Sequence, residues 1–78
     1  MNGGRLPVVN GRQVIRALTL AGFVLNRIAG SHHILVHRSD PRRAVTVPVH
    51  AGRDLKRGTI RSILRQAGVT VEEFVRLL

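Results

Sequence analysis

The residues best suited to chemistry in this sequence are the run Gly30-Ser31-His32-His33, in which two histidines follow a glycine–serine bend. Histidine is the side chain whose ordinary pKa, about 6.5, lets it accept or donate a proton near neutral pH. Glycine permits a close approach of the backbone to a ligand, and serine offers a hydroxyl and an N–H group to a phosphate. The run therefore predicts a proton-transfer group beside a bound phosphate, with an ordinary strand-to-strand turn as the alternative.

The charge of the chain indicates what carries that phosphate. Lysine and arginine number 13 against four carboxylates, which gives a formal net charge of +9, and no carboxylate precedes Asp40. This balance is typical of a nucleic-acid-binding domain, so we expect a phosphodiester backbone as the partner. We expect RNA and not DNA, because no recognition helix with base-reading Asn or Gln stands out. An Arg-rich surface that only aids solubility is the alternative. No segment has the apolar anchors or the length that a membrane requires, and we predict a cytoplasmic protein that contacts no membrane.

Apolar periodicity and capping residues predict the elements that position these residues. We expect residues 1–9 to form a loosely ordered lead-in and residues 10–78 a single domain, because this length suffices for one modest core. A capping box of Asn10 and Gln13 begins the first helix. In chain order we predict a helix over residues 11–21, strands over 23–28, 32–38 and 44–49, a helix capped by Thr59 that ends at Gly68, and a short last helix capped by Thr70 and Glu73.

This order, α-β-β-β-α with a short extra C-terminal helix, predicts an α+β fold. Short connections favour an antiparallel sheet of three strands with the helices on one face, as in double-stranded-RNA-binding domains. With only two aromatic residues, Phe23 and Phe74, the remainder of the core must come from aliphatic side chains.

The histidines occupy different positions in the predicted sheet. Side chains alternate along a strand, so His32 and His33 must lie on opposite faces. We expect His32 to share the helix-covered face with Ile34 and Val36, which would enclose it, and His33 to point the other way. Antiparallel pairing brings His50, at the end of the third strand, toward His32, where it would be a second proton carrier or phosphate contact, or a plain loop histidine.

The other candidate contacts to phosphate are Arg53, Lys56, Arg57 and Thr59, which lead into the second helix. A helix N-terminus offers free N–H groups and a partial positive charge to an anion. A solvated loop is the alternative. No cysteine is present and the histidines lack the spacing of a zinc site, so we predict neither a metal nor another cofactor.

Several segments together resemble the HicA family of toxins from toxin–antitoxin systems. The resemblance rests on Gly22-Phe23, on Gly30-Ser31-His32, on the segment from Val45 to His50, and on the segment from Leu55 to Gly68, and it extends from about Val14 to Leu78. It implies a fold like that of double-stranded-RNA-binding domains and an endoribonuclease (mRNA interferase) that cleaves mRNA without a metal. It also implies that His32 is the functional histidine and that a HicB-type antitoxin blocks the site. The alternative is an RNA-binding module of the same fold that does not cleave.

Overall fold

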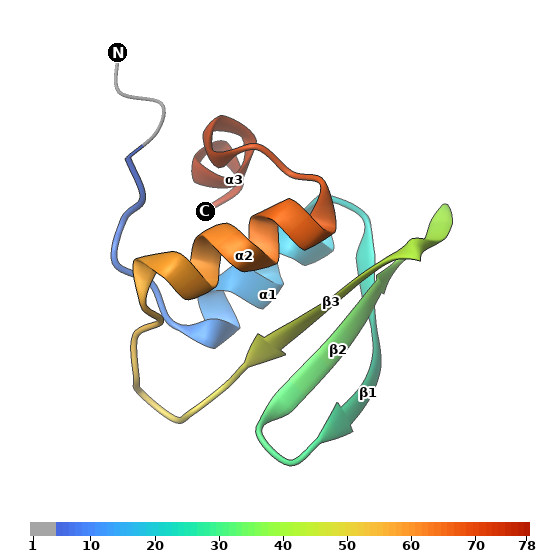
Figure 1. Cartoon of the computed structure of the whole chain (residues 1–78), viewed down its shortest axis with the longest axis horizontal. Coiled ribbons are helices and arrows are strands. Elements are labelled where there is room, and N and C mark those ends of the chain that lie inside the picture. The colour runs from blue at the N-terminus through green and yellow to red at the C-terminus, as the bar shows by residue number, and fades with distance from the viewer. Residues whose placement is uncertain (1–4) are drawn as a thin grey trace.

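A computed structural model describes residues 5–78 of the chain and confirms the predicted order of elements. The elements are α1 (Gly11–Leu20), β1 (Phe23–Ala29), β2 (His32–His37), β3 (Asp40–Pro48), α2 (Arg57–Ala67) and α3 (Val71–Leu77), as labelled in Figure 1. The strands form one antiparallel sheet in the order β1-β2-β3. This is the α+β fold that the sequence predicts.

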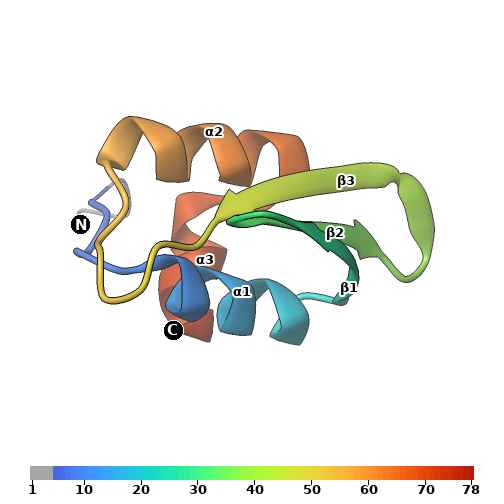
Figure 2. The ribbon, with the colours of Figure 1, turned by 90° about the horizontal axis from the view of Figure 1, so that it is seen from below.

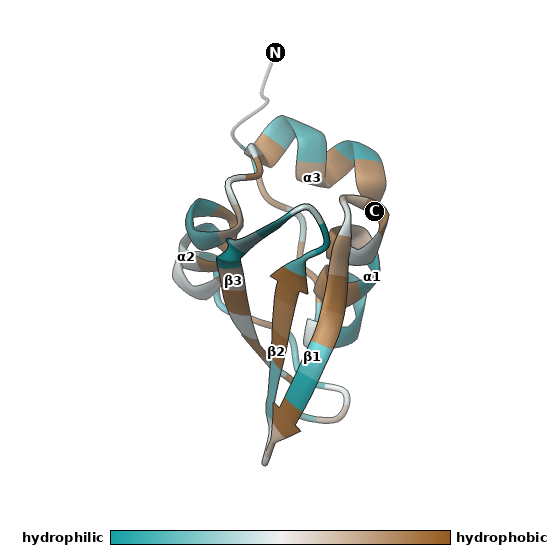
Figure 3. Cartoon of the chain, turned by 90° about the vertical axis from the view of Figure 1, so that its right-hand side faces the viewer, coloured by the Kyte–Doolittle hydropathy of each residue, from teal (hydrophilic) through white to brown (hydrophobic). Residues whose placement is uncertain are grey.

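Helices α1 and α2 lie behind one face of the sheet, α3 packs against these two helices, and within residues 5–78 no element covers the other, bare face (Figure 3). The buried core includes both phenylalanines, of which neither is exposed. Phe23 and Phe74 are joined in this core by aliphatic residues, of which the largest are Leu18, Leu35 and Ile60. Beyond the helices, the β2–β3 hairpin projects past the ends of α1 and α2 (Figure 2).

Local side-chain contacts begin two of the helices as predicted. The Asn10 side chain accepts the Gln13 N–H at 2.9 Å and the Gln13 side chain accepts the Asn10 N–H at 2.8 Å, which completes the capping box of α1. At α3 the Thr70 hydroxyl accepts the Glu73 N–H at 3.1 Å. The prediction for α2 was wrong, because this helix begins at Arg57, and Lys56 is its N-cap in place of Thr59. The Lys56 carbonyl accepts the Ile60 N–H, so the first turn forms without a side-chain cap.

The segment before α1 contributes to the core. Residues 1–4 of the predicted lead-in lie outside the described residues, but Leu6 and Val9 are buried. The Val9 carbonyl accepts the Leu55 N–H at 2.8 Å, and Asn10 forms an isolated bridge with Asp54. These contacts attach the loop between β3 and α2 to the beginning of α1.

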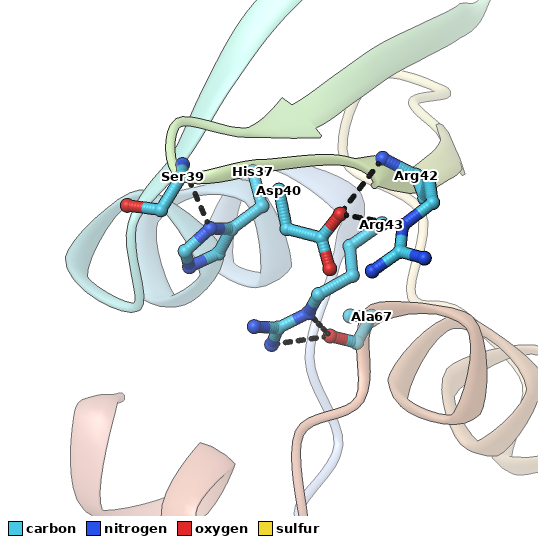
Figure 4. A network of polar contacts seen from close by, with 6 residues as sticks. All are labelled: His37, Ser39, Asp40, Arg42, Arg43 and Ala67. Atoms are coloured by element: carbon cyan, nitrogen blue, oxygen red, sulfur yellow. Dashed lines mark hydrogen bonds and ion pairs between the residues drawn. The ribbon is translucent and has the colours of Figure 1, made fainter.

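Strand β3 begins earlier than predicted, at Asp40, so that the turn after β2 consists of Arg38 and Ser39 alone. Pro41 precedes the predicted strand over 44–49 but lies inside β3, where an edge position tolerates the missing N–H group. The Arg42 side chain and backbone N–H both bond Asp40, which lowers the pKa of this carboxyl group (Figure 4).

Arg43 fastens this end of the hairpin to the helices (Figure 4). Its Nε and Nη2 atoms both donate to the Ala67 carbonyl, at 3.0 and 2.7 Å, and its guanidinium lies 5.5 Å from the centre of the Phe23 ring. Ala67 is the last residue of α2, where carbonyl groups lack partners within the helix and a positive charge is favourable. One side chain therefore completes the end of α2 and contacts the core.

Replacing Arg43 with methionine is expected to lower the free energy of unfolding by about 1.5–3 kcal/mol, the usual contribution of hydrogen bonds to a charged group. The methionine keeps an apolar stem but removes both bonds to Ala67. Urea denaturation followed by circular dichroism measures the change. Arg42→Met is the matched control, because the Arg42 side chain is 90% exposed and pairs with Asp40 at the surface. Equal losses in the two variants would contradict the assigned role of Arg43.

Candidate functional site

The turn that precedes His32 has the geometry expected of a glycine–serine bend. Gly30 has a φ of +60°, a left-handed conformation that glycine adopts without strain, and the space where a Cβ atom would lie is open. The Ser31 carbonyl accepts the Val49 N–H at 2.7 Å, which joins the turn to the end of β3. His32 is the first residue of β2 and pairs with Ala29 on one side and Pro48 on the other. Its backbone is therefore held by strands on both sides.

The predicted face of His32 was wrong. Residues directly opposite in neighbouring strands share a face, and Leu35 lies opposite Val45 while His33 lies opposite Val47. Leu35, Val45 and Val47 are buried beneath the helices, so the odd-numbered residues of β2 face the core. His32, with Ile34 and Val36, lies on the bare face, and its side chain is exposed. An exposed ring is accessible to a polymer, but the enclosure that we expected to orient it is absent at this end of β2.

His33 occupies the more enclosed position. It is half-buried on the helix-covered face, and within residues 5–78 its buried Nδ1 atom has no hydrogen-bond partner. The two neighbouring histidines therefore cannot approach one reacting atom from the same side of the sheet. His33 was predicted to contact phosphate, and the structure places it apart from His32.

His50 is brought close to the turn, as the antiparallel pairing predicts, because the preceding residue, Val49, bonds Ser31. Its exposed side chain lines a small hollow together with residues 10–12, 49, 51 and 52. Arg12 in this hollow was not predicted as a site residue. Its position depends on the close packing of α1 on β3, where a Cβ atom on Gly11 would collide with the Pro48 carbonyl oxygen. No pattern in the sequence signals that contact.

The predicted basic segment lies between His50 and the first turn of α2. The Arg53 N–H bonds the His50 carbonyl at 2.9 Å, and Arg53, Lys56 and Arg57 are exposed. Thr59 is half-buried in the first turn of α2, which contains no acidic residue and no side-chain cap. Figure 1 shows this segment leading from the end of β3 to the beginning of α2. The N–H groups of that turn and three positive side chains are therefore available to an anion.

Arg27 is a further basic residue on the bare face. It lies opposite Ile34 in the neighbouring strand and is exposed, so it shares the face of His32. The sequence indicated only that Arg27 lies on the sheet, because a bulge between Leu25 and Arg27 shifts the alternation of β1. Arg43, by contrast, is directed to α2 and is not available to the site.

Within residues 5–78 no three side chains of histidine, cysteine, aspartate or glutamate are grouped so that they could hold a metal ion. None of the helices in this part of the chain has the length and apolar character needed to cross a membrane.

The geometry defines a class of protein: a small basic α+β domain with an exposed histidine on a bare sheet face, beside a glycine–serine turn. Comparison with known families matches residues 11–69 to the family described as the HicA toxin of bacterial toxin–antitoxin systems. The match covers more than half of the chain, and the chain belongs to this family. No curated protein matches it. The protein is thus a toxin of a toxin–antitoxin family, which confirms the resemblance noted in the sequence.

Proposed function

We propose that this toxin is an endoribonuclease that cleaves mRNA without a metal ion and that His32 is its acid–base residue. The observation that carries the proposal is the position of His32 in a chain of this family: exposed, next to the Gly30-Ser31 turn, on a face that also presents Arg27. RNA is polyanionic, so a chain of net charge +9 attracts it whatever the nucleotide sequence of the RNA. Because mRNA is translated in the cytoplasm, we propose that the toxin acts there.

The chemistry is an in-line displacement at a phosphodiester. The ribose 2′-oxygen forms a bond to phosphorus while the bond from phosphorus to the 5′-oxygen breaks. His32 either accepts the proton of the 2′-hydroxyl or donates a proton to the departing 5′-oxygen, and water supplies or accepts the other proton. The products are a 2′,3′-cyclic phosphate, or the 3′-phosphate formed from it by hydrolysis, and a 5′-hydroxyl end.

The remaining residues of the site bind and orient the substrate. Gly30 and Ser31 allow a phosphate to approach the backbone at the turn, and His50 lies close to the same turn. Arg53, Lys56, Arg57 and the first turn of α2 with Thr59 hold the RNA further along its backbone. Positive charge near the phosphate also stabilises the charge that develops in the transition state. In this assignment His33 does not contact the reacting phosphate, because it faces the helices.

Cleavage of an end-labelled single-stranded RNA by the purified chain in excess EDTA tests the proposal. We expect shortened products with 5′-hydroxyl ends, which a kinase labels without prior phosphatase treatment. Products with 5′-phosphate ends, or activity that requires added magnesium, would contradict the mechanism. Salt-sensitive binding of RNA that stays intact would identify a binding module of the same fold instead.

A further inference from the structure

The two edges of the sheet differ in how well they are protected from pairing with another strand. The outer edge of a sheet carries N–H and C=O groups that can bond a further strand, and proteins block such edges with proline and charged residues. Strand β3 contains Pro41 and Pro48 together with Arg42. Strand β1 contains no proline, and within residues 5–78 no strand pairs with its outer edge. Figure 1 shows β1 on the outer side of the sheet. The edge of β1 is therefore the open one.

Strand β1 also exposes apolar side chains, which is typical of a strand that pairs with a further strand. Val24, Leu25 and Ile28 are 45%, 51% and 54% exposed. The pairing with β2 places Val24 on the bare face. It places Leu25 and Ile28 on the helix-covered face, where both side chains remain exposed. Figure 3 shows hydrophobic segments at both ends of β1 with a hydrophilic stretch between them. In the sequence of the strand, Asn26 and Arg27 lie between its apolar residues. An added strand would cover apolar surface on both faces of this edge.

The charge of the chain indicates which kind of molecule would pair with this edge. A second copy would bring a net charge of +9 against +9, and the two would repel. RNA would meet three aliphatic side chains and a single arginine on β1, which is a poor phosphate-binding surface. A strand of another protein with carboxylates among its apolar residues would satisfy the edge N–H groups, the aliphatic side chains and Arg27 together. In a toxin of a toxin–antitoxin family, the antitoxin is the partner that must bind this protein.

We infer that an acidic strand of the antitoxin pairs with the open edge of β1 and becomes the fourth strand of the sheet. Ala29 of β1 lies directly opposite His32. Since strands are spaced about 4.8 Å apart, the added strand would lie about 10 Å from the backbone of His32, and its side chains on the bare face would obstruct a bound RNA. The bulge at Asn26 interrupts the regular series of N–H and C=O groups along this edge. A partner strand must have an irregularity at the same position, which discourages pairing with strands of other proteins. This inhibitory role depends on the proposed site at His32, but the pairing itself does not.

The test compares two valines of similar exposure. Val24→Glu on β1 places a negative charge at the open edge, whereas Val75→Glu changes a 42% exposed valine on α3. Affinity for the full-length cognate antitoxin is measured by calorimetry at physiological salt concentration. We expect Val24→Glu to weaken binding about tenfold or more, because a like charge then faces the acidic strand, and Val75→Glu to bind as the parent does. A third variant, Val24→Lys, keeps the attraction and should bind more tightly than Val24→Glu.

Hydrogen exchange distinguishes strand pairing from contact through side chains alone. Amides along the outer edge of β1 should exchange more slowly in the complex than in the free toxin. Equal affinity of Val24→Glu and the parent, or unchanged exchange along β1, would overturn the inference, as would an effect of Val24→Glu on RNA binding or on self-association instead. Circular dichroism of each variant verifies its fold. Cleavage of RNA is measured separately, without antitoxin. If the parent protein does not cleave RNA, the proposed nuclease activity is refuted, and the affinity and exchange measurements still decide whether the strand pairs with β1.

Discussion

Replacing His32 with alanine is expected to reduce the rate of RNA cleavage by about 10²–10⁴-fold, the usual contribution of one general acid or base. The side chain is exposed on the bare face of the sheet, so its removal leaves no cavity, and the free energy of unfolding should stay close to that of the parent. RNA affinity should also change little, because arginine and lysine carry most of the attraction to the backbone. The loss therefore concerns the chemical step, and it is measured as the single-turnover rate in EDTA at saturating protein.

His33→Gln provides the control for this experiment. It removes the imidazole of the adjacent residue, which lies on the opposite face with its Nδ1 unbonded in the described structure. We expect this variant to cleave RNA at nearly the parental rate. Equal rates for the parent and His32→Ala would transfer the role of acid or base to His33 or His50. Loss of RNA binding along with cleavage would instead make His32 a phosphate contact.

Replacing Phe23 with alanine is expected to cost about 3–5 kcal/mol of unfolding free energy, the typical loss for a buried phenylalanine. Phe23 is fully buried at the beginning of β1, where its ring stands edge-on to that of His37 at 5.1 Å and beneath the guanidinium of Arg43. A domain of this size has a total stability of only about 4–12 kcal/mol. The loss is therefore between about a quarter and all of the total stability, and urea denaturation followed by circular dichroism measures it.

Leu20→Ala is the comparison for Phe23→Ala, since Leu20 is a large apolar residue that is 64% exposed on α1. This variant should change the free energy of unfolding by no more than about 0.5 kcal/mol, as is usual for surface positions. A double-mutant cycle of Phe23→Leu and Arg43→Met should show a coupling of about 0.5–1 kcal/mol from the cation–π contact. A small effect of Phe23→Ala would mean that the core does not depend on this ring.

Interactions between residues close in the chain made the elements of this fold predictable. The capping box of Asn10 and Gln13 is a contact over three residues, and the apolar stripe of α2 repeats within one helix. The predicted beginning of α2 was wrong, because Thr59 has the chemistry of a cap but Lys56 takes the extended conformation of the N-cap without a side-chain bond. The run Gly30-Ser31-His32 and the charge of +9 were likewise visible, because they depend on composition and order alone.

The faces of the sheet could be decided only by the tertiary structure. Alternation along β2 requires His32 and His33 to point in opposite directions, but Ile34, Leu35 and Val36 are all apolar and do not reveal which set is covered. The register of β2 with β3 decides it, because Leu35 and His33 lie opposite the buried Val45 and Val47. The contact of Arg43 with Ala67 and the open edge of β1 are likewise decided by how distant parts of the chain pack together. The sequence by itself determined which elements form and which residues could do chemistry. Which of those residues meet, and which edge stays open, depended on contacts between elements far apart in the chain.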